Sequence, residues 1–483
     1  MATFNLIRNS RVFFTTNVDS TTGVIPSSGA TISSSNTFEL QVLDGFSFSQ
    51  GTQQATIQIS EAGNTPVRGQ RAFNTSKDPV DFSFSKYIRP YNSTGVTAEE
   101  SVLWNALLCA TPIDSTGKTV TVSAFSRATT LTNVVTVACT AADLSTYGIA
   151  SGDIITVGTI TGTQGNEWNN AAELTITAGT SSACTGFTLT YLTAPSAAAG
   201  TAPSSTPATI KLFKGAWTQH AATTGVAARA LAHTGASNKN QLQKFGMYFV
   251  VDSVIYAVDN CALDQAQVDF SLDGIATVQW SGKATALRQL PSTAVISGST
   301  FSGTGNATGS AAAKNVDAQF ITNKLSTLKI IGDIQGSGTV YNVALTGGSF
   351  TYSNNINYVT PANLGVVNVP ITYFTGTRSI TGSVTAYLRT GSGNSAQLQS
   401  DILSGLSTTT ETKFRLQVEI GGASNTVHVD LDIKGAQLQV PTTETGDVMS
   451  TTINFTAQGY DPILANNTFD LAQTNDLSIT YYA

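Results

Sequence analysis

The stretch Leu43-Asp44-Gly45-Phe46-Ser47-Phe48-Ser49 recurs 302 residues later as Leu345-Thr346-Gly347-Gly348-Ser349-Phe350-Thr351. A shorter run, Tyr87-Ile88-Arg89, recurs 300 residues later as Tyr387-Leu388-Arg389. Two matches with nearly the same spacing, about forty residues apart, indicate an internal duplication, which sets how all other segments are divided into domains. We therefore predict two copies of one domain.

Both matches lie in runs that alternate apolar and polar residues, a pattern typical of β-strands with one buried face. A short helix is predicted after each. In the first copy Thr97 and Glu100 have the spacing of a capping box. The apolar stripe that follows consists of Leu103, Trp104, Leu107 and Leu108. In the second copy the stripe consists of Leu398, Ile402 and Leu406, with Gly405 near the expected helix end. Further strands are predicted at 244–250 and 413–418.

The two copies differ in the distance from the helix to the next strand. Cys109 and Lys244 are 135 residues apart, whereas Leu406 and Lys413 are 7 apart. Short β-branched and apolar runs at 134–137, 154–157, 174–176 and 187–191 predict that the extra chain is a small β module. The Ala, Ser, Pro and Thr residues of 193–207 predict a tether, and the module is expected on the outer surface.

Small residues at 291–318, among them Gly303, Gly305 and Gly309, predict a linker between the copies. The sequence thus predicts an all-β chain. Its first domain is discontinuous, at 1–114 and 215–290, and is interrupted by the module at 115–214. The second domain occupies 319–483.

Composition favours a protein that assembles with other subunits. Only 11% of the 483 residues are charged, against about 25% in an average soluble protein. A surface rich in Ser, Thr, Asn and Gln costs little to desolvate, so much of it can be buried in contacts. The net charge of −6 disfavours stable binding to the phosphates of nucleic acid.

No stretch reaches the roughly 18 to 20 apolar residues of a membrane span, and the N-terminus has no apolar core of signal-peptide length. We therefore expect a protein that is soluble where it is made, with free thiols in a reducing cytosol. Cys109 is expected in the core, Cys139 and Cys184 in the inserted module, and Cys261 in a polar turn.

Candidates for chemistry are few. His220, His233 and His428 have no Cys, Asp or Glu at metal-ligand spacing, so structural or surface roles and no metal are expected. The run Gly303-Thr304-Gly305-Asn306 begins like a dinucleotide loop, but its third glycine comes one residue late and no strand-to-helix context surrounds it. No cofactor is therefore expected.

Asp430 and Asp432 lie two residues apart on one predicted strand and so face the same side. Such a pair could serve glycoside hydrolysis, although a solvated strand face is the favoured interpretation. The sequence has no nucleophile elbow, phosphate loop or HExxH motif. We expect no enzymatic activity and no catalytic residues.

Several motifs carry a resemblance to a known family. They are Leu6-Ile7-Arg8-Asn9-Ser10-Arg11-Val12-Phe13, Glu61-Ala62-Gly63 with Pro66, Arg68 and Gly69, Phe82-Ser83-Phe84-Ser85-Lys86-Tyr87-Ile88 with Pro90-Tyr91, Leu103-Trp104-Asn105-Ala106-Leu107, Val278-Gln279-Trp280-Ser281-Gly282 and Val440-Pro441-Thr442-Thr443-Glu444-Thr445-Gly446-Asp447-Val448. The chain resembles the tail tube proteins of long-flexible-tailed bacteriophages, in the subclass with a duplicated tube domain. It departs from a relative that carries its additional immunoglobulin-like domain at the C-terminus, because here the extra module lies inside the first copy.

The resemblance implies a β-sandwich with a flanking helix in each copy and a structural role in the virion tail. Two copies per chain imply rings of three chains with a six-fold internal shape. Neighbouring inner sheets would join into a barrel, through which genomic DNA passes without stable binding. The long connections at 60–80 and 354–379 would reach the adjacent ring.

The partners implied are other copies of the chain, the tape measure protein and the tail tip and terminator proteins, with assembly in the host cytoplasm and no membrane contact. The module could also touch host surface glycans weakly through many copies. Two other functions stay open: a glycan-depolymerising tail protein, and a receptor-binding or decoration protein. Copy number per virion separates these from a tube protein.

Overall fold

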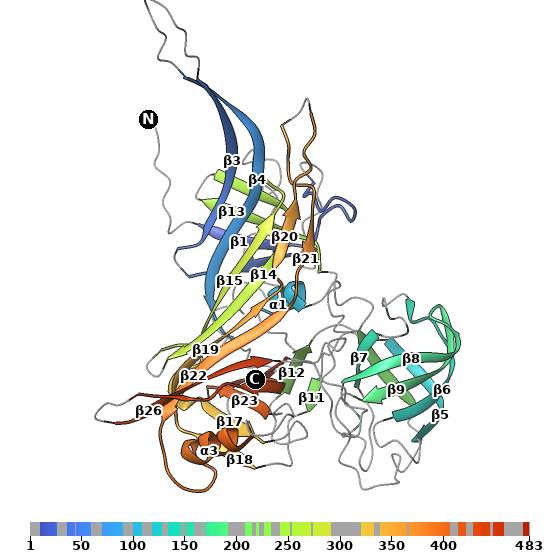
Figure 1. Ribbon diagram of the computed structural model, residues 1–483. Helices are drawn as coiled ribbons and strands as arrows, with labels where there is room; N and C mark the ends of the chain where they lie inside the picture. The colour runs from blue at the N-terminus through green and yellow to red at the C-terminus, as the bar shows by residue number, and fades with distance from the viewer. Residues whose placement is uncertain are drawn as a thin grey trace, which may run out of the picture.

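The computed structural model describes residues 10–26, 36–43, 45–58, 70–89, 100–108, 118–127, 134–145, 149, 151, 153–158, 168, 171–191, 208–214, 219–221, 227–232, 242–251, 254–271, 274–290, 320–332, 339–364, 367–405, 414–421, 428–444, 448–457 and 477–482. Nearly all the elements are β-strands (Figure 1), and the predicted all-β class is confirmed.

In the described residues, the first copy contains eight strands and a helix. They are β1 (Arg11–Thr15), β2 (Thr37–Leu40), β3 (Ser47–Gln58), β4 (Gln70–Tyr87), α1 (Ser101–Leu108), β13 (Phe245–Val251), β14 (Val254–Ser271), β15 (Thr277–Ala284) and β16 (Ala286–Leu290). Buried residues alternate with partly or fully exposed ones along 80–87 of β4, along 265–271 of β14 and along the whole of β15, which fits strands with one face on a core.

The second copy repeats this order. Its elements are the 3-10 helix η4 (Asn323–Leu325), β17 (Thr327–Ile331), β18 (Val340–Val343), β19 (Leu345–Ser353), β20 (Ile356–Val359), β21 (Thr372–Thr375), β22 (Ser379–Tyr387), α3 (Ser395–Gly405), β23 (Phe414–Ile420), β24 (His428–Leu438), β25 (Thr442–Glu444), β26 (Ser450–Ala457) and β27 (Ser478–Tyr482). The helix α3 ends at Gly405, as its sequence predicts.

The pairing of the strands is duplicated as well. In the first copy β2 pairs with β1, β1 with β13, β13 with β14, β14 with β15, β15 with β4 and β4 with β3, always antiparallel. In the second copy the same chain of contacts runs through β18, β17, β23, β24, β26, β22 and β19. Each pairing of the first copy therefore has a counterpart in the second.

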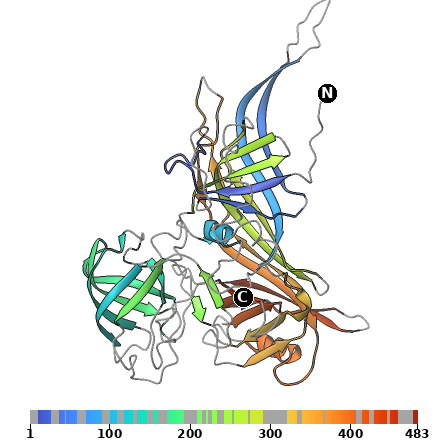
Figure 2. The same ribbon diagram turned by 180° about the vertical axis from the view of Figure 1, so that it is seen from behind.

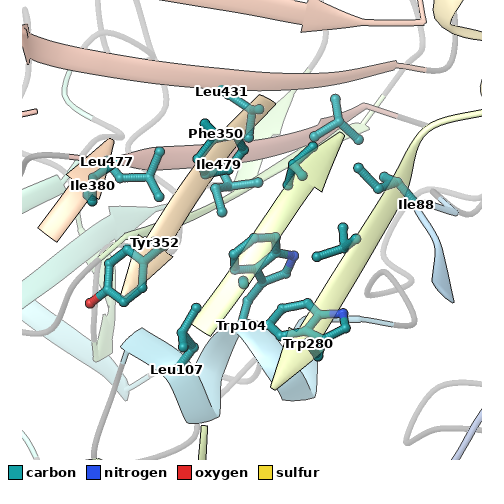
Figure 3. Close-up of a cluster of buried hydrophobic side chains, with 14 of the residues drawn as sticks. Ile88, Trp104, Leu107, Trp280, Phe350, Tyr352, Ile380, Leu431, Leu477 and Ile479 are labelled. Carbon is teal, nitrogen blue, oxygen red and sulfur yellow. The ribbon is translucent and has the colours of Figure 1, made fainter. Parts of the chain in front are cut away.

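The two copies share one hydrophobic core. A row of buried side chains crosses from the first copy to the second through Phe84, Trp280, Ala266, Tyr352 and Ile380. Trp104 of α1 packs edge-to-face on Trp280, with ring centroids 4.6 Å apart (Figure 3). Residues far apart in the sequence, such as Ile88 and Leu431, belong to the same cluster. Folding of one copy therefore supports the other.

The start of α1 differs from the sequence prediction. The helix begins at Ser101, and Glu100 lies just before it, whereas the capping box would place Glu100 inside the helix. The Glu100 carboxylate accepts a hydrogen bond from the Arg89 backbone N–H at 3.0 Å and lies 3.6 Å from Lys86 Nζ, with both charged side chains fully buried. This buried pair ties the helix to the end of β4. Thr97 lies outside the described residues.

A separate closed barrel interrupts the first copy between α1 and β13. Its strands are β5 (Lys118–Arg127), β6 (Val134–Ala142), β7 (Asp153–Gly158), β8 (Ala171–Thr180), β9 (Ala183–Tyr191) and β10 (Thr209–Lys214), in the closed order β10-β5-β6-β9-β8-β7. It has a core of its own around Trp168, Phe187 and Tyr191. The barrel lies to one side of the duplicated sheets (Figures 1 and 2), within the range 115–214.

Two short strands lie between the barrel and β13. They are β11 (Gln219–Ala221) and β12 (Ala227–Ala232), and β12 pairs with β27, which also pairs with β24. His220 lies on β11. His233, Cys109, Leu406, the predicted tether at 193–207 and the predicted linker at 291–318 with its glycine run lie outside the described residues.

Besides the start of α1, three sequence expectations differ from the structure. Cys261 lies fully buried in β14 rather than in a polar turn, and burial raises the pKa of its thiol well above the ordinary value. Much of the predicted connection at 60–80 is strand, because β4 begins at Gln70. The predicted connection at 354–379 contains the β20–β21 hairpin.

None of the helices in the described part of the chain has the length and apolar character needed to cross a membrane.

Candidate functional site

The face of the joined sheet that points away from the core carries short polar side chains. The longest row of directly opposed residues crosses seven strands through Ser85, Gln279, Gln267, Thr351, Thr381, Thr456 and Gln437. A neighbouring row contains Ser47 and Ser83, whose hydroxyl oxygens are 2.9 Å apart. Because side chains alternate along a strand, this polar face is the reverse of the apolar row that includes Trp280. We call it the polar face.

Charge on the polar face is sparse and mainly acidic. Lys283 Nζ forms an ion pair with Asp81 at 2.8 Å. Asp269 accepts a hydrogen bond from Gln267 Nε2 at 3.0 Å, and Glu444 lies opposite Ser450 at the far end of the sheet. In these rows three carboxylates accompany a single ammonium group, so the surface attracts no polyanion strongly.

A shallow hollow of about 240 Å³ lies on the polar face beside β3. Its lining includes Ser47, Ser49, Ser83 and Ser281, together with the Asp81–Lys283 pair. The described residues contain no group of three or more His, Cys, Asp or Glu that could hold a metal ion. The hollow is therefore lined by hydroxyl groups, by one ion pair and by the Asp264 carboxylate, which accepts a hydrogen bond from the Ile356 backbone N–H.

The junction between the copies is a pair of strand edges. The C-terminal half of β14 pairs with β19, from Gln265 opposite Ser353 to Ser271 opposite Gly347. The sheet therefore runs β3-β4-β15-β14-β19-β22-β26-β24, four strands from each copy. Here β14, an edge strand of the first copy in this sheet, pairs with β19, an edge strand of the second copy.

The same two kinds of edge are left open at the ends of this sheet. Within the described residues, β3 pairs only with β4, and β25 pairs only with β26. By their partners, β3 is the counterpart of β19, and the segment from β24 to β25 is the counterpart of β14. Open edges offer backbone N–H and C=O groups to another strand. The chain thus has two complementary ends.

The two carboxylates singled out by the sequence lie beside basic side chains, and Asp432 forms an ion pair with Arg415. Asp432 accepts two hydrogen bonds from the Arg415 guanidinium, at 2.9 Å and 2.8 Å. Asp430 lies 3.5 Å from Nε2 of the buried His428. Both lie where β24 pairs with β23 and β27, away from the polar face. A partly buried carboxylate held by arginine stabilises the sheet, and neither group faces a cavity that the structure describes.

Sequence reasoning missed the polar face, although its signal is in the sequence. Every second residue of 277–283 and 379–387 is polar, but alternation alone distinguishes two faces without saying which one is buried. The contacts of Trp104 and α1 with the opposite face decide this.

Comparison with known proteins gives a sequence relative. No family model matches the chain. The tail tube protein pb6 of Escherichia phage T5, a long flexible-tailed siphophage, is 25% identical over 463 residues, which cover 94% of this chain and 72% of that protein. The chain is a structural β protein with complementary open sheet edges. Over nearly its whole length it is similar to a bacteriophage tail tube protein, and this similarity supports a structural role in the virion tail.

Proposed function

We propose that three chains form each ring of the tail tube and that the polar face lines its lumen, through which genomic DNA is ejected into the host. The observation that carries this proposal is the β14–β19 junction, where two tube domains are already joined edge to edge. We take it as the template for the contact between chains.

The template gives a register for that contact. In the first copy Tyr87 lies opposite Thr277, which lies opposite Asp269. In the second copy Tyr387 lies opposite Ser450, which lies opposite Glu444. Glu444 is therefore the counterpart of Asp269. Asp269 pairs with Ser349 at the internal junction.

Ser47 is the counterpart of Ser349, because they lie opposite Ser83 and Ser383. The register between chains then places Glu444 of one chain opposite Ser47 of the next.

A head-to-tail contact of this kind closes into a ring when its rotation divides a full turn. The six-fold internal shape implied by the family, with two domains per chain, gives three chains. In each copy the long strands β14 and β24 leave the polar-faced sheet for a second layer, which supports a β-sandwich tube domain.

The position of the helix supports a polar lumen. The helix α1 packs on the core side of the sheet, opposite the polar face. The barrel follows α1 directly in the chain and so leaves from the outer side. A lumen lined by Ser, Thr, Asn and Gln with a slight excess of carboxylates lets DNA slide, because fixed positive charge would retain its phosphates.

Further partners and the lack of enzymatic activity are also part of this proposal. A tube of defined length calls for a tape measure protein and for tip and terminator proteins, with assembly in the host cytoplasm. We propose that the chain is not an enzyme, supported by the engagement of Asp432 with Arg415. Incubation of assembled tubes with host polysaccharide should leave the polysaccharide uncleaved.

Electron cryomicroscopy of tubes assembled from the purified chain tests the ring directly. We expect three chains and three external barrels per ring, with the polar face inside. Densitometry of virion proteins should give many tens of copies per particle. Six chains per ring, or barrels inside the lumen, would overturn the proposal, and a few copies per virion would favour a receptor-binding protein.

A further inference from the structure

The β20–β21 hairpin of the second copy packs against the first copy beside the β14–β19 junction, a contact that we call the grip. Tyr358 donates its hydroxyl proton to the backbone carbonyls of Asn260 at 2.7 Å or Lys283 at 3.0 Å. The Tyr373 hydroxyl donates to the Leu242 carbonyl at 3.0 Å. The hairpin therefore adds contacts that the paired edges alone do not supply.

The base of this hairpin is buried in the first copy. Asn354 Nδ2 donates to the carbonyl oxygens of Leu107 at 3.0 Å and Leu263 at 3.2 Å. The Ile356 backbone N–H donates to Asp264 Oδ1 at 2.7 Å, and the Ile356 side chain is 2% exposed. Each tube domain that follows another is thus held by its edge strand and by its hairpin.

The first copy has a corresponding hairpin, formed by residues 52–58 of β3 and 70–77 of β4, which we call the distal β3–β4 hairpin. Phe73 lies ten residues before Ser83, as Tyr373 lies ten before Ser383, so Phe73 is the counterpart of Tyr373. Ala55 lies opposite Phe73, and Ile57 lies opposite Arg71, so the Phe73 and Ile57 side chains share one face of the ribbon. Both are 51% exposed.

The receiving positions in the second copy are also open. Lys283 and Asp264 lie under the β20–β21 hairpin and are partly covered. The counterpart of Lys283 is Thr456, because Lys283 lies opposite Ala262 and Thr456 lies opposite Gln437. The counterpart of Asp264 is Gln439, because each follows a leucine at equivalent positions, Leu263 and Leu438. Thr456 and Gln439 are both exposed.

We propose that the distal β3–β4 hairpin grips the second copy of the neighbouring chain, with Phe73 and Ile57 packed against the end of its β26. The occupant of this surface is a second copy of the same chain. The inference rests on the proposed ring, because the hairpin and the β3 edge must then contact the same neighbour.

Removing the two apolar side chains tests the grip. The double variant Ile57→Ser with Phe73→Ser should melt like the wild type as a monomer, yet need at least about tenfold more protein to reach half assembly in a sedimentation assay. Leu403→Ser is the matched control, because Leu403 is 49% exposed on α3 and takes no part in the grip. Half assembly of the double variant at the wild-type concentration would overturn the inference.

Cross-linking identifies which neighbour is held. Ala55 occupies the place of Tyr358, so Ala55→Cys with Thr456→Cys should be joined by a flexible bis-maleimide into dimers and trimers on a denaturing gel, and nothing larger. Each variant with only one of the two added cysteines, and the wild type with its four native cysteines, should stay monomeric. A ladder beyond three chains would assign the hairpin to the next ring and overturn the inference.

The outcomes also separate the two proposals. Rings of three chains without this cross-link would reject only the grip, whereas rings of six chains would reject the proposed function itself.

Discussion

The ring of Phe82 covers Gly282 on the adjacent strand, and at the same place in the second copy the ring of Phe455 covers Gly382. A Cβ atom on Gly282 would lie 2.4 Å from Phe82 Cζ, and one on Gly382 would lie 2.4 Å from Phe455 Cζ. Aromatic residues often pack over glycine in a neighbouring strand. The two copies keep this contact but exchange which strand supplies the ring.

The first prediction concerns this contact. Gly282→Val should lower the free energy of unfolding by about 1 to 3 kcal/mol, because the new side chain displaces the Phe82 ring in a packed core and its Cβ would lie 2.6 Å from the Ala262 carbonyl oxygen. The exchange Gly282→Phe with Phe82→Gly restores the arrangement of the second copy and should recover most of the loss. Denaturant unfolding measures both, and additive losses in the exchanged variant would contradict the prediction.

The second prediction tests the shared core. Trp104 is 1% exposed and packs on Trp280, so Trp104→Ala should cost about 3 to 5 kcal/mol and abolish tube assembly. Trp168→Ala in the separate core of the barrel is the control. It should unfold the barrel and leave the tubes intact, as seen by electron microscopy. Tubes from Trp104→Ala at the wild-type yield would show that the core tolerates the cavity.

The third prediction removes the barrel. Replacing residues 118–214 with a short Gly/Ser link should change the stability of the remaining chain by only about 1 to 2 kcal/mol, since closure entropy depends weakly on loop length. The tubes should keep their inner diameter and lose their outer knobs. The deletion should include β10, because Ile210 and Leu212 on that strand belong to the barrel core and would otherwise be left without it. A folded chain that no longer polymerises would place the barrel in an assembly contact.

The fourth prediction concerns acid. Burial alone would raise the pKa of Glu419, but hydrogen bonds from Lys329 and Thr327 outweigh it and lower this pKa below its ordinary value of 4.5. A lowered pKa means that the carboxylate stabilises the fold above pH 4.5 and that this contribution disappears as the pH falls further. Glu419→Gln should therefore melt closer to the wild type at pH 3.5 than at pH 7. An equal difference in melting temperature at both pH values would contradict this.

Particular residues show how far the sequence could be interpreted. Tyr87 and Tyr387 revealed the duplication because the short runs that they begin recur at nearly the same spacing as the other repeat, and each follows a strand with an alternating pattern. The start of β4 at Gln70 was hidden, because residues 70–77 are mostly polar and Phe73 is the one large apolar side chain among them, so no alternating pattern is visible. Cys261 follows Asp259 and Asn260, which have turn-like composition. In the fold they are buried, with Asp259 held by Arg288 and by the Ile25 backbone N–H.

The polar face and the open edges depend on contacts between distant strands, which no local pattern contains. The place of the barrel in the chain could be predicted, because the helix and the next strand are 135 residues apart in the first copy and 7 in the second. Recognising this difference requires no knowledge of contacts.

The exchanged aromatic and glycine also bear on how a chain with two similar halves avoids misfolding. Like repeats can trade strands while they fold. If β4 paired with β26, Phe82 would meet Phe455, and if β22 paired with β15, Gly382 would face Gly282. The β4–β26 mispairing would place two phenylalanine rings where the native pairing has one. The β22–β15 mispairing would place two glycines there and no ring. The exchange therefore disfavours pairing between strands of different copies and favours pairing within each copy.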